Sequence, residues 1–166
     1  RWGVRGSLWA PSFVSVKAHL PPHPTRLYFI RHGEVEEGFH RIFGGARIDM
    51  GLSALGHEHA QALVDWFGSS PLDAIYSSPM QRARLTAAPL VEARGLQPVV
   101  IPGLREVDFG DWTGLRWEQI QERFGVVAYD WLEILEDGGI PNGESAAQLR
   151  ERVRPCLMRV VEENPH

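Results

Sequence analysis

From Arg26 onward the chain alternates strand-like and helix-like segments, with no repeats and no low-complexity tracts. This order is typical of an α/β domain built on a mostly parallel sheet. The first apolar segment, Leu27–Ile30, reads as a buried strand, and two further strands are predicted at 72–76 and 97–101. Parallel strands joined by right-handed crossovers end at the same edge of the sheet. We therefore expect the ligand site of this domain at that edge.

Four helical segments are predicted from apolar periodicity and from the residues at their ends: 53–67, 78–95, 115–136 (two short helices that divide near Gly125) and 145–163. Ser53 is the predicted N-cap of the first helix. Ser78 and Ser145 are predicted N-caps because a Gln follows each of them at the capping-box position. The last helix is expected to direct one apolar face inward: Leu149, Val153, Cys156, Leu157, Val160 and Val161.

Charged side chains follow each of the three predicted strands. Arg31 and His32 come directly after the first strand. Arg82 lies in the first turn of the helix after the second strand, and Glu106 follows the third. Gly33 removes a side chain that would crowd the turn after His32, and it is a candidate phosphate-binding position. We expect these residues to surround one crevice.

Such a crevice suits a phosphoryl group. Free N–H groups and the dipole at the start of a helix favour an anion beside Arg82, and Arg31 adds a planar fork of donors. The neutral imidazole of His32 can attack phosphorus when its other nitrogen is held as an N–H donor. Glu106 can protonate the leaving oxygen and later deprotonate a water. A lone His or Arg is more often a surface residue, but the convergence of four groups favours catalysis.

Other polar and aromatic residues favour simpler interpretations. His57 and His59 lie two positions apart on a predicted helix, so their side chains diverge and a solvated face is favoured over a metal site. Asp108 and Asp111 are predicted to form hydrogen bonds within a loop. Three tryptophans could flank a substrate entrance, but core packing is favoured for at least two of them: Trp112, Trp117 and Trp131.

The composition limits the classes of partner and compartment. The chain has 166 residues, a formal net charge of −4 and a pI near 6.0, so it has no general attraction to nucleic acid or to anionic membranes. Cys156 is the only cysteine, which excludes a disulfide framework and a cysteine metal site and fits a reducing, cytoplasmic location. Residues 1–24 contain no apolar run long enough for a signal peptide or a membrane span.

The first residue is Arg rather than Met, and the sequence PPHP separates the segment before it from the rest of the chain. We therefore expect an irregular or non-native tail at residues 1–24 and a single domain at residues 25–166.

Four motifs resemble those of the histidine phosphatase superfamily, also called the phosphoglycerate mutase-like family: RHGE at 31–34, YSSPMQRARLTA at 76–87, LREVDFGDWTG at 104–114 and PNGES at 141–145. The match extends over about residues 26–163. The resemblance implies a three-layer α/β/α fold with a mostly parallel sheet. It also implies that His32 becomes a phosphohistidine, that Arg31 and Arg82 clamp the phosphoryl group, and that Glu106 donates and accepts the proton. No metal or organic cofactor is implied.

The chain departs from the family pattern in two places. The family commonly has Asn six residues after the nucleophilic His, where this sequence has Gly38. One phosphate contact is then missing, or it comes from the backbone of Gly44 or Gly45. The family's second active-site His follows a strand after the last helix. His166 cannot replace it, because the helix from Ser145 carries the chain about 27 Å toward the opposite edge. We expect a domain truncated before its last core strand, with unpaired backbone groups and an open flank.

The short span from Glu106 to the PNGES motif most resembles small bacterial phosphatases, especially alpha-ribazole phosphatase. Phosphoglycerate mutases usually carry a longer insertion with paired arginines, and no Arg-Arg pair occurs between 106 and 145. The preferred function is therefore a phosphomonoesterase that acts through phosphohistidine on a small phosphorylated metabolite, impaired by the truncation. A phosphoglycerate mutase and a non-catalytic phosphate-binding module are the alternatives. No nucleic acid or membrane partner is expected, and the sequence leaves the substrate and the oligomeric state open.

Overall fold

The computed structural model describes residues 24–165. Its helices are α1 (Ala54–Phe67), α2 (Gln81–Arg94), α3 (Trp117–Phe124), α4 (Trp131–Glu136) and α5 (Ala146–Glu163). Its short 3-10 helices are η1 (Glu37–Phe39), η2 (Pro102–Leu104), η3 (Gly110–Trp112) and η4 (Ala128–Asp130), and its strands are β1 (Tyr76–Ser77) and β2 (Val99–Val100). The predicted tail at residues 1–24 lies outside the described residues except for Pro24, and so does His166.

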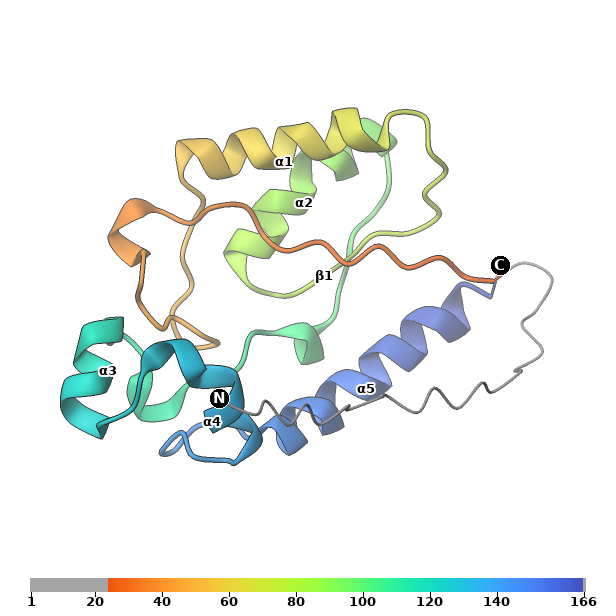
Figure 1. Cartoon of the computed structure of the whole chain (residues 1–166). Helices are drawn as coiled ribbons and strands as arrows, with labels where there is room; N and C mark the ends of the chain where they lie inside the picture. The colour runs from red at the N-terminus through yellow and green to blue at the C-terminus, as the bar shows by residue number, and fades with distance from the viewer. Residues whose placement is uncertain (1–23, 166) are drawn as a thin grey trace, which may run out of the picture.

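The two strands form a parallel pair, as the sequence predicts. Tyr76 lies opposite Val99 and Ser77 lies opposite Val100, and α2 makes the crossover between them. β2 lies within the predicted strand 97–101 but is shorter, whereas β1 shares only Tyr76 with the predicted strand 72–76. The helices α1 and α2 pack together on one side of the pair, and α5 lies on the other side (Figure 1), so the domain is of the α/β class.

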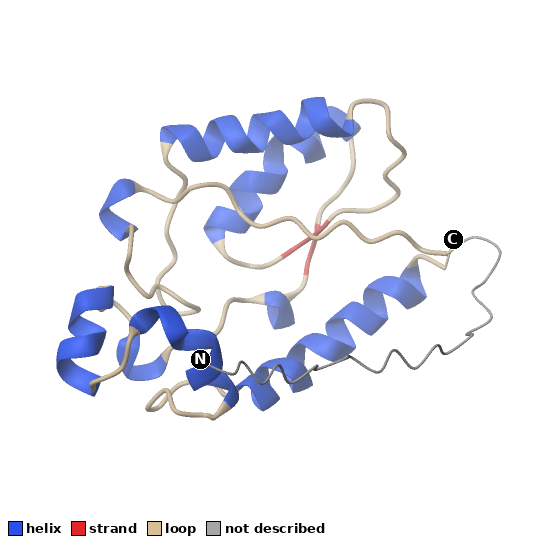
Figure 2. Cartoon of the chain, in the orientation of Figure 1, coloured by secondary structure: helices blue, strands red, loops and turns tan. Residues whose placement is uncertain are grey.

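The prediction of a buried strand at Leu27–Ile30 is wrong. The segment is extended but is not part of a sheet, and Figure 2 draws it as loop. Phe29 is 76% exposed and Ile30 is 47% exposed. A strand is stabilised by hydrogen bonds to a neighbouring strand, and none of the other described segments forms backbone hydrogen bonds with residues 26–30. The apolar pattern is therefore real, but it lacks a pairing partner within residues 24–165.

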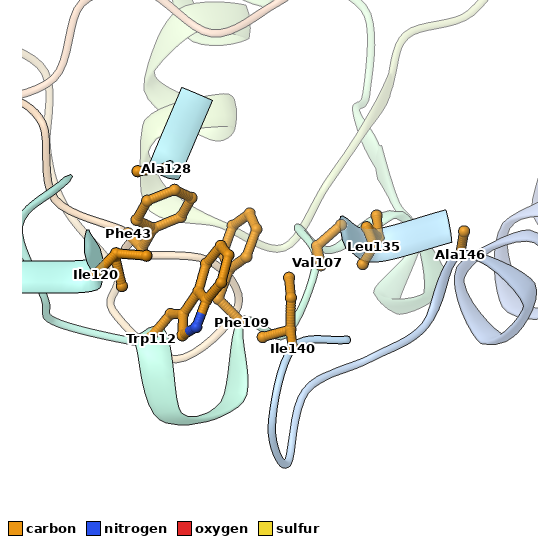
Figure 3. Close-up of a cluster of buried hydrophobic side chains, with 9 residues drawn as sticks. All are labelled: Phe43, Val107, Phe109, Trp112, Ile120, Ala128, Leu135, Ile140 and Ala146. Carbon is orange, nitrogen blue, oxygen red and sulfur yellow. The ribbon is translucent and has the colours of Figure 1, made fainter. Parts of the chain in front are cut away.

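The hydrophobic core is formed by side chains of η3, α3, η4, α4 and the start of α5, together with side chains of the loops that connect them to the rest of the domain (Figure 3). Its buried members are Phe43, Val107, Phe109, Trp112, Ile120, Ala128, Leu135, Ile140 and Ala146. The Phe43 ring packs edge-on against Phe109, with centroids 4.8 Å apart, and against Trp112 at 5.3 Å. Trp117 and Trp131 are partly buried against this cluster. The core role predicted for the tryptophans is confirmed.

The helix ends test the predicted caps. Ser53 Oγ accepts a hydrogen bond from the backbone N–H of Gly56, so the predicted N-cap of α1 is confirmed. The predicted capping box at the start of α5 is also present, formed by Ser145 and Gln148. Along α5 the predicted inward face is correct at Val160, which is buried, but wrong at Val161, which is 39% exposed.

The predicted N-cap of α2 is wrong by two residues. The cap is Met80 rather than Ser78, and α2 begins at Gln81. The N–H of Gln81 donates to Asp49 Oδ1 at 2.7 Å, so a side chain from a distant loop satisfies the helix start. Ser78 Oγ instead accepts from the N–H of Met80 at 3.3 Å.

None of the helices within residues 24–165 combines the length and the apolar composition needed to cross a membrane.

Candidate active site

The imidazole of His32 is held in one tautomer. Its Nδ1 lies 2.7 Å from the carbonyl oxygen of Gly33 and must donate, because a carbonyl oxygen only accepts. The lone pair therefore stays on Nε2. Burial lowers the pKa of His32, and the positive charges of Arg82 and Arg31 act in the same direction, although the hydrogen bond to Gly33 opposes them. The ring is therefore neutral near pH 7, which is the form that can act as a nucleophile.

The turn that carries His32 is anchored to α2 and pressed against α1. The N–H of Gly33 donates to Thr86 Oγ1 at 2.9 Å, and Thr86 Oγ1 donates in turn to the carbonyl oxygen of Arg82 at 2.7 Å. A Cβ at position 33 would lie only 2.5 Å from the carbonyl oxygen of Gly56. Glycine at position 33 therefore permits the close approach of the turn to α1.

Arg82 is buried, and backbone carbonyl oxygens accept from two of its nitrogens. Its side chain is only 4% exposed. Nη2 donates to the carbonyl oxygen of Gly45 at 3.3 Å, and Nη1 donates to that of Ile48 at 3.5 Å. Glu106 Oε2 lies 3.7 Å from Nη2. A buried guanidinium needs such partners, because an unpaired charge is costly to bury.

The loop that holds Arg82 also contacts the segment of Glu106. Gly45 has a φ of +54°, and a Cβ there would lie 2.5 Å from the carbonyl oxygen of Val107. The next residue, Ala46, donates its N–H to that same oxygen at 2.9 Å. The carbonyl of Gly45 faces Arg82, so any phosphate contact by Gly45 has to come from its N–H.

The two carboxylate oxygens of Glu106 have different partners. Oε1 accepts from the N–H of Val107 at 2.9 Å, whereas Oε2 faces Arg82. The side chain is 40% exposed, so water and a leaving group have access to it. Arg31 is exposed and is near enough for its charge to lower the pKa of His32. The charge of Glu106 raises that same pKa. The charges of Arg31, Arg82 and Glu106 therefore all act on His32, and the catalytic role of each residue stays a prediction.

Two carboxylates of the loop after Glu106 form local hydrogen bonds and ion pairs. Asp108 accepts from the N–H of Gly110 and pairs with Arg47 at 2.7 Å, and Asp111 accepts from Asn142 Nδ2 at 3.0 Å. Both are loop hydrogen-bonders, as predicted. The side chains of His57 and His59 are exposed. Within residues 24–165 no cluster of His, Cys, Asp and Glu could hold a metal ion.

Sequence reasoning missed Thr86, which links the turn of His32 to α2. The signal was available, because Thr86 lies four residues after Arg82 and therefore on the same face of α2. It also missed Asp49 as the partner of the first turn of α2. No local pattern connects Asp49 to Gln81, which lies 32 residues further along the chain.

His32 borders an open hollow of about 770 Å³ between the extended segment 24–30, β1, α2 and α5. Apolar side chains form much of its wall, including Leu90, Leu157 and Val160.

Comparison with known proteins identifies relatives over most of the chain. Residues 27–166 match the model of the histidine phosphatase superfamily (branch 1). Phosphoserine phosphatase 1 of Hydrogenobacter thermophilus is 32% identical over 136 residues, which cover 82% of this chain and 64% of that protein. The adenosylcobalamin/alpha-ribazole phosphatase of Escherichia coli K12 is 29% identical over 141 residues, which cover 82% of this chain and 67% of that protein.

A solved structure has a similar fold. The mycobacterial glucosyl-3-phosphoglycerate phosphatase superposes with a TM-score of 0.72 at 32% identity, covering 81% of this chain and 62% of that chain. The chain spans 64% of the length of its phosphoserine phosphatase relatives from Hydrogenobacter.

Proposed function

The chain belongs to the histidine phosphatase superfamily, and we propose that it is a phosphomonoesterase that acts through a phosphohistidine at His32. The observation that carries this proposal is the state of the imidazole. Nδ1 donates to the carbonyl of Gly33, so Nε2 keeps its lone pair, and the lowered pKa keeps the ring neutral. The close pair of Arg82 and Glu106 supports the proposal further.

In the proposed first step, Arg31 and Arg82 hold the phosphoryl oxygens, and the nearby start of α2 favours the same negative charge. Nε2 of His32 attacks phosphorus, and the bond from phosphorus to the ester oxygen breaks. Glu106 gives its proton to that oxygen, so the substrate alcohol leaves as a neutral molecule.

In the proposed second step, water replaces the alcohol. Glu106, now a carboxylate, removes a proton from the water as its oxygen attacks the phosphorus of phosphohistidine. The P–N bond breaks, inorganic phosphate leaves, and both His32 and the protonated Glu106 are regenerated. No metal or organic cofactor takes part in this scheme.

The substrate proposed is a small phosphorylated metabolite, with alpha-ribazole phosphate as the first compound to test. The relationship to the Escherichia coli phosphatase supports this choice. A mutase is less favoured, because no Arg-Arg pair between 106 and 145 is available for the rest of a phosphoglycerate. We also propose that residues 25–166 form the domain that carries this activity. The proposed location of the protein is the cytoplasm.

A non-catalytic phosphate-binding module is the second candidate. The observation in its favour is Gly38, which stands where the family commonly has an Asn donor to phosphate. Loss of one preorganised donor typically lowers the rate by about 10²–10³, so turnover should be slow.

The test is hydrolysis of para-nitrophenyl phosphate by the wild-type chain and by His32→Ala and Glu106→Gln. We expect hydrolysis by the wild type and none above background by His32→Ala. Equal rates for the wild type and His32→Ala would reject the proposed role of His32. Binding of inorganic phosphate with no hydrolysis would favour the binding module.

A further inference from the structure

Arg152, in the second turn of α5, uses all of its guanidinium N–H groups. Nε and Nη2 donate to the two carboxylate oxygens of Glu144 at 2.5 and 2.6 Å. Nη1 donates to the carbonyl oxygens of Gly103 at 2.7 Å and of Arg105 at 2.9 Å. Nη2 also donates to the carbonyl oxygen of Glu106 at 3.1 Å. These contacts account for every donor that an arginine side chain has.

The pair of Arg152 and Glu144 is largely withdrawn from water. The side chain of Arg152 is 15% exposed and that of Glu144 is 8% exposed. Burial would raise the pKa of Glu144, but the hydrogen bonds and the charge of Arg152 hold it below its ordinary value. The two-pronged geometry fixes the orientation of the guanidinium as well as its position. None of the proposed chemical steps uses either residue.

The three carbonyl acceptors belong to one short stretch of backbone, residues 103–106, which ends at Glu106. This stretch also lies tightly against α5, because a Cβ on Gly103 would collide with Cys156 Sγ and would lie 3.3 Å from the carbonyl oxygen of Arg152. Arg152 therefore fastens the backbone of Glu106 to a long helix. The carboxylate at the end of this stretch, that of Glu106, lies 3.7 Å from Arg82.

We propose that Arg152, oriented by Glu144, is a positioning residue for Glu106. It fixes the backbone of residues 103–106 so that the carboxylate of Glu106 stays beside Arg82 and at the right place to transfer a proton. This inference rests on the proposed function, because it assigns a partner to the proton donor of that reaction. Arg152 binds backbone oxygens rather than the reacting atoms, so it is not a catalytic residue.

A misplaced proton donor has a characteristic kinetic effect. An alkyl phosphate has a poorly stabilised leaving oxygen that needs the proton, whereas para-nitrophenolate leaves readily without it. Displacement of Glu106 should therefore slow alkyl phosphate hydrolysis more than para-nitrophenyl phosphate hydrolysis. A purely structural role for Arg152 would slow both reactions by the same factor.

The test compares kcat/KM for the two substrates in the wild type, Glu106→Gln, Arg152→Lys and Arg150→Lys. Lysine keeps the positive charge but lacks the planar fork. Arg150 is the matched control, because it lies on the same helix and its ion pair with Glu136 is exposed. Arg152→Lys should lower the alkyl phosphate rate about 10- to 100-fold more than the aryl rate, since misplacement by about 1 Å can cost 10²-fold. Arg150→Lys should change neither.

A second variant and a second measurement keep the test decisive if Arg152→Lys folds poorly. Glu144→Gln preserves the shape of the side chain but removes the charge that pairs with Arg152. It should therefore also lower the alkyl phosphate rate more than the aryl phosphate rate, by a smaller factor than Arg152→Lys does. Hydrogen exchange should become faster across residues 103–108 in both variants and stay unchanged in α1.

The outcomes separate the two proposals. If Glu106→Gln is selective for the alkyl phosphate but Arg152→Lys and Glu144→Gln slow both substrates equally, the positioning role is wrong and the proposed function stands. If Glu106→Gln shows no selectivity, Glu106 is not the proton donor, and both the proposed mechanism and the positioning role are overturned.

Discussion

The carboxylate of Glu106 lies 3.7 Å from the guanidinium of Arg82, whose side chain is only 4% exposed. This contact joins the segment after β2 to the first turn of α2. It places Glu106, the proposed proton donor, beside Arg82, which is proposed to bind the phosphoryl group. Burial lowers the pKa of His32, and the guanidinium of Arg82 lowers it further. A change at Arg82 should therefore disturb binding, the nucleophile and the acid together.

Arg82→Gln should weaken the binding of inorganic phosphate about 10- to 100-fold, because a charge-assisted hydrogen bond contributes about 1.5–3 kcal/mol. Titration calorimetry with phosphate measures the change. Arg84→Gln is the control, since Arg84 is also on α2 but is exposed. Unchanged phosphate affinity in a folded Arg82→Gln protein would remove Arg82 from the binding site.

Thr86→Val should destabilise the protein by about 1–3 kcal/mol, because it leaves the buried N–H of Gly33 without an acceptor. It should also slow para-nitrophenyl phosphate hydrolysis, since the turn of His32 loses its attachment to α2. Thr86→Ser retains the hydroxyl group and should keep the rate. Urea unfolding and the hydrolysis assay check the two effects. Equal rates for Thr86→Val and Thr86→Ser would show that this hydrogen bond does not position His32.

Gly33→Ala should cost about 1–3 kcal/mol of stability, because its Cβ would lie 2.5 Å from the carbonyl oxygen of Gly56 and would push the turn away from α1. Gly38→Ala is the control. A Cβ at position 38 would meet no atom within 4 Å, and the change should stay within about 0.5 kcal/mol. Unfolding in urea should therefore give a lower free energy of unfolding for Gly33→Ala than for Gly38→Ala. A Gly33→Ala protein as stable as Gly38→Ala would contradict the close packing.

The lowered pKa of His32 makes its contribution to stability depend on pH. The unfolded chain takes up this proton nearer to the ordinary value of 6.5, whereas the folded chain takes it up at a lower pH. The contribution is therefore fully present above about pH 6.5 and is lost as the pH falls through the folded-state pKa.

Urea unfolding of the wild type and of His32→Gln tests this sign. The free energy of unfolding of the wild type minus that of the variant should become smaller as the pH is lowered from about 7.5 to about 5. Other titrating groups are present in both proteins and largely cancel in the difference. A difference that grows toward low pH would mean that the pKa of His32 is raised rather than lowered.

Features coded by neighbouring residues were predictable. The caps at Ser53 and Ser145 are local, because each side chain accepts from an N–H three residues further on, and both helices start as predicted. The start of α2 was placed two residues early, because its first N–H binds Asp49, a loop residue distant in sequence. Leu27–Ile30 has the composition of a buried strand, but pairing depends on a neighbour that no local pattern reports.

The candidate site was predictable for a different reason. Arg82 and Glu106 each follow a strand of the parallel pair, so topology places them at one edge. His32 follows a segment outside the sheet, and the hydrogen bond from Gly33 to Thr86 holds its turn near Arg82.

The contacts that fix the positions of Arg82 and Glu106 were not predictable, because they are hydrogen bonds to backbone carbonyl oxygens. Arg82 binds carbonyl oxygens of the loop at residues 45–48, and Arg152 binds those of residues 103–106. A carbonyl is present at every residue, so the sequence does not mark which ones are used.

The most direct test of the account is to trap the phosphoenzyme. The wild type and His32→Ala are mixed with a phosphorus-labelled aryl phosphate, quenched in alkaline denaturant to preserve an acid-labile P–N bond, and digested for mass spectrometry. We expect a phosphoryl group on the imidazole of His32 in the wild type and none in the variant. Hydrolysis of the substrate with no label on His32, or equal labelling of His32→Ala at another residue, would contradict the proposed mechanism.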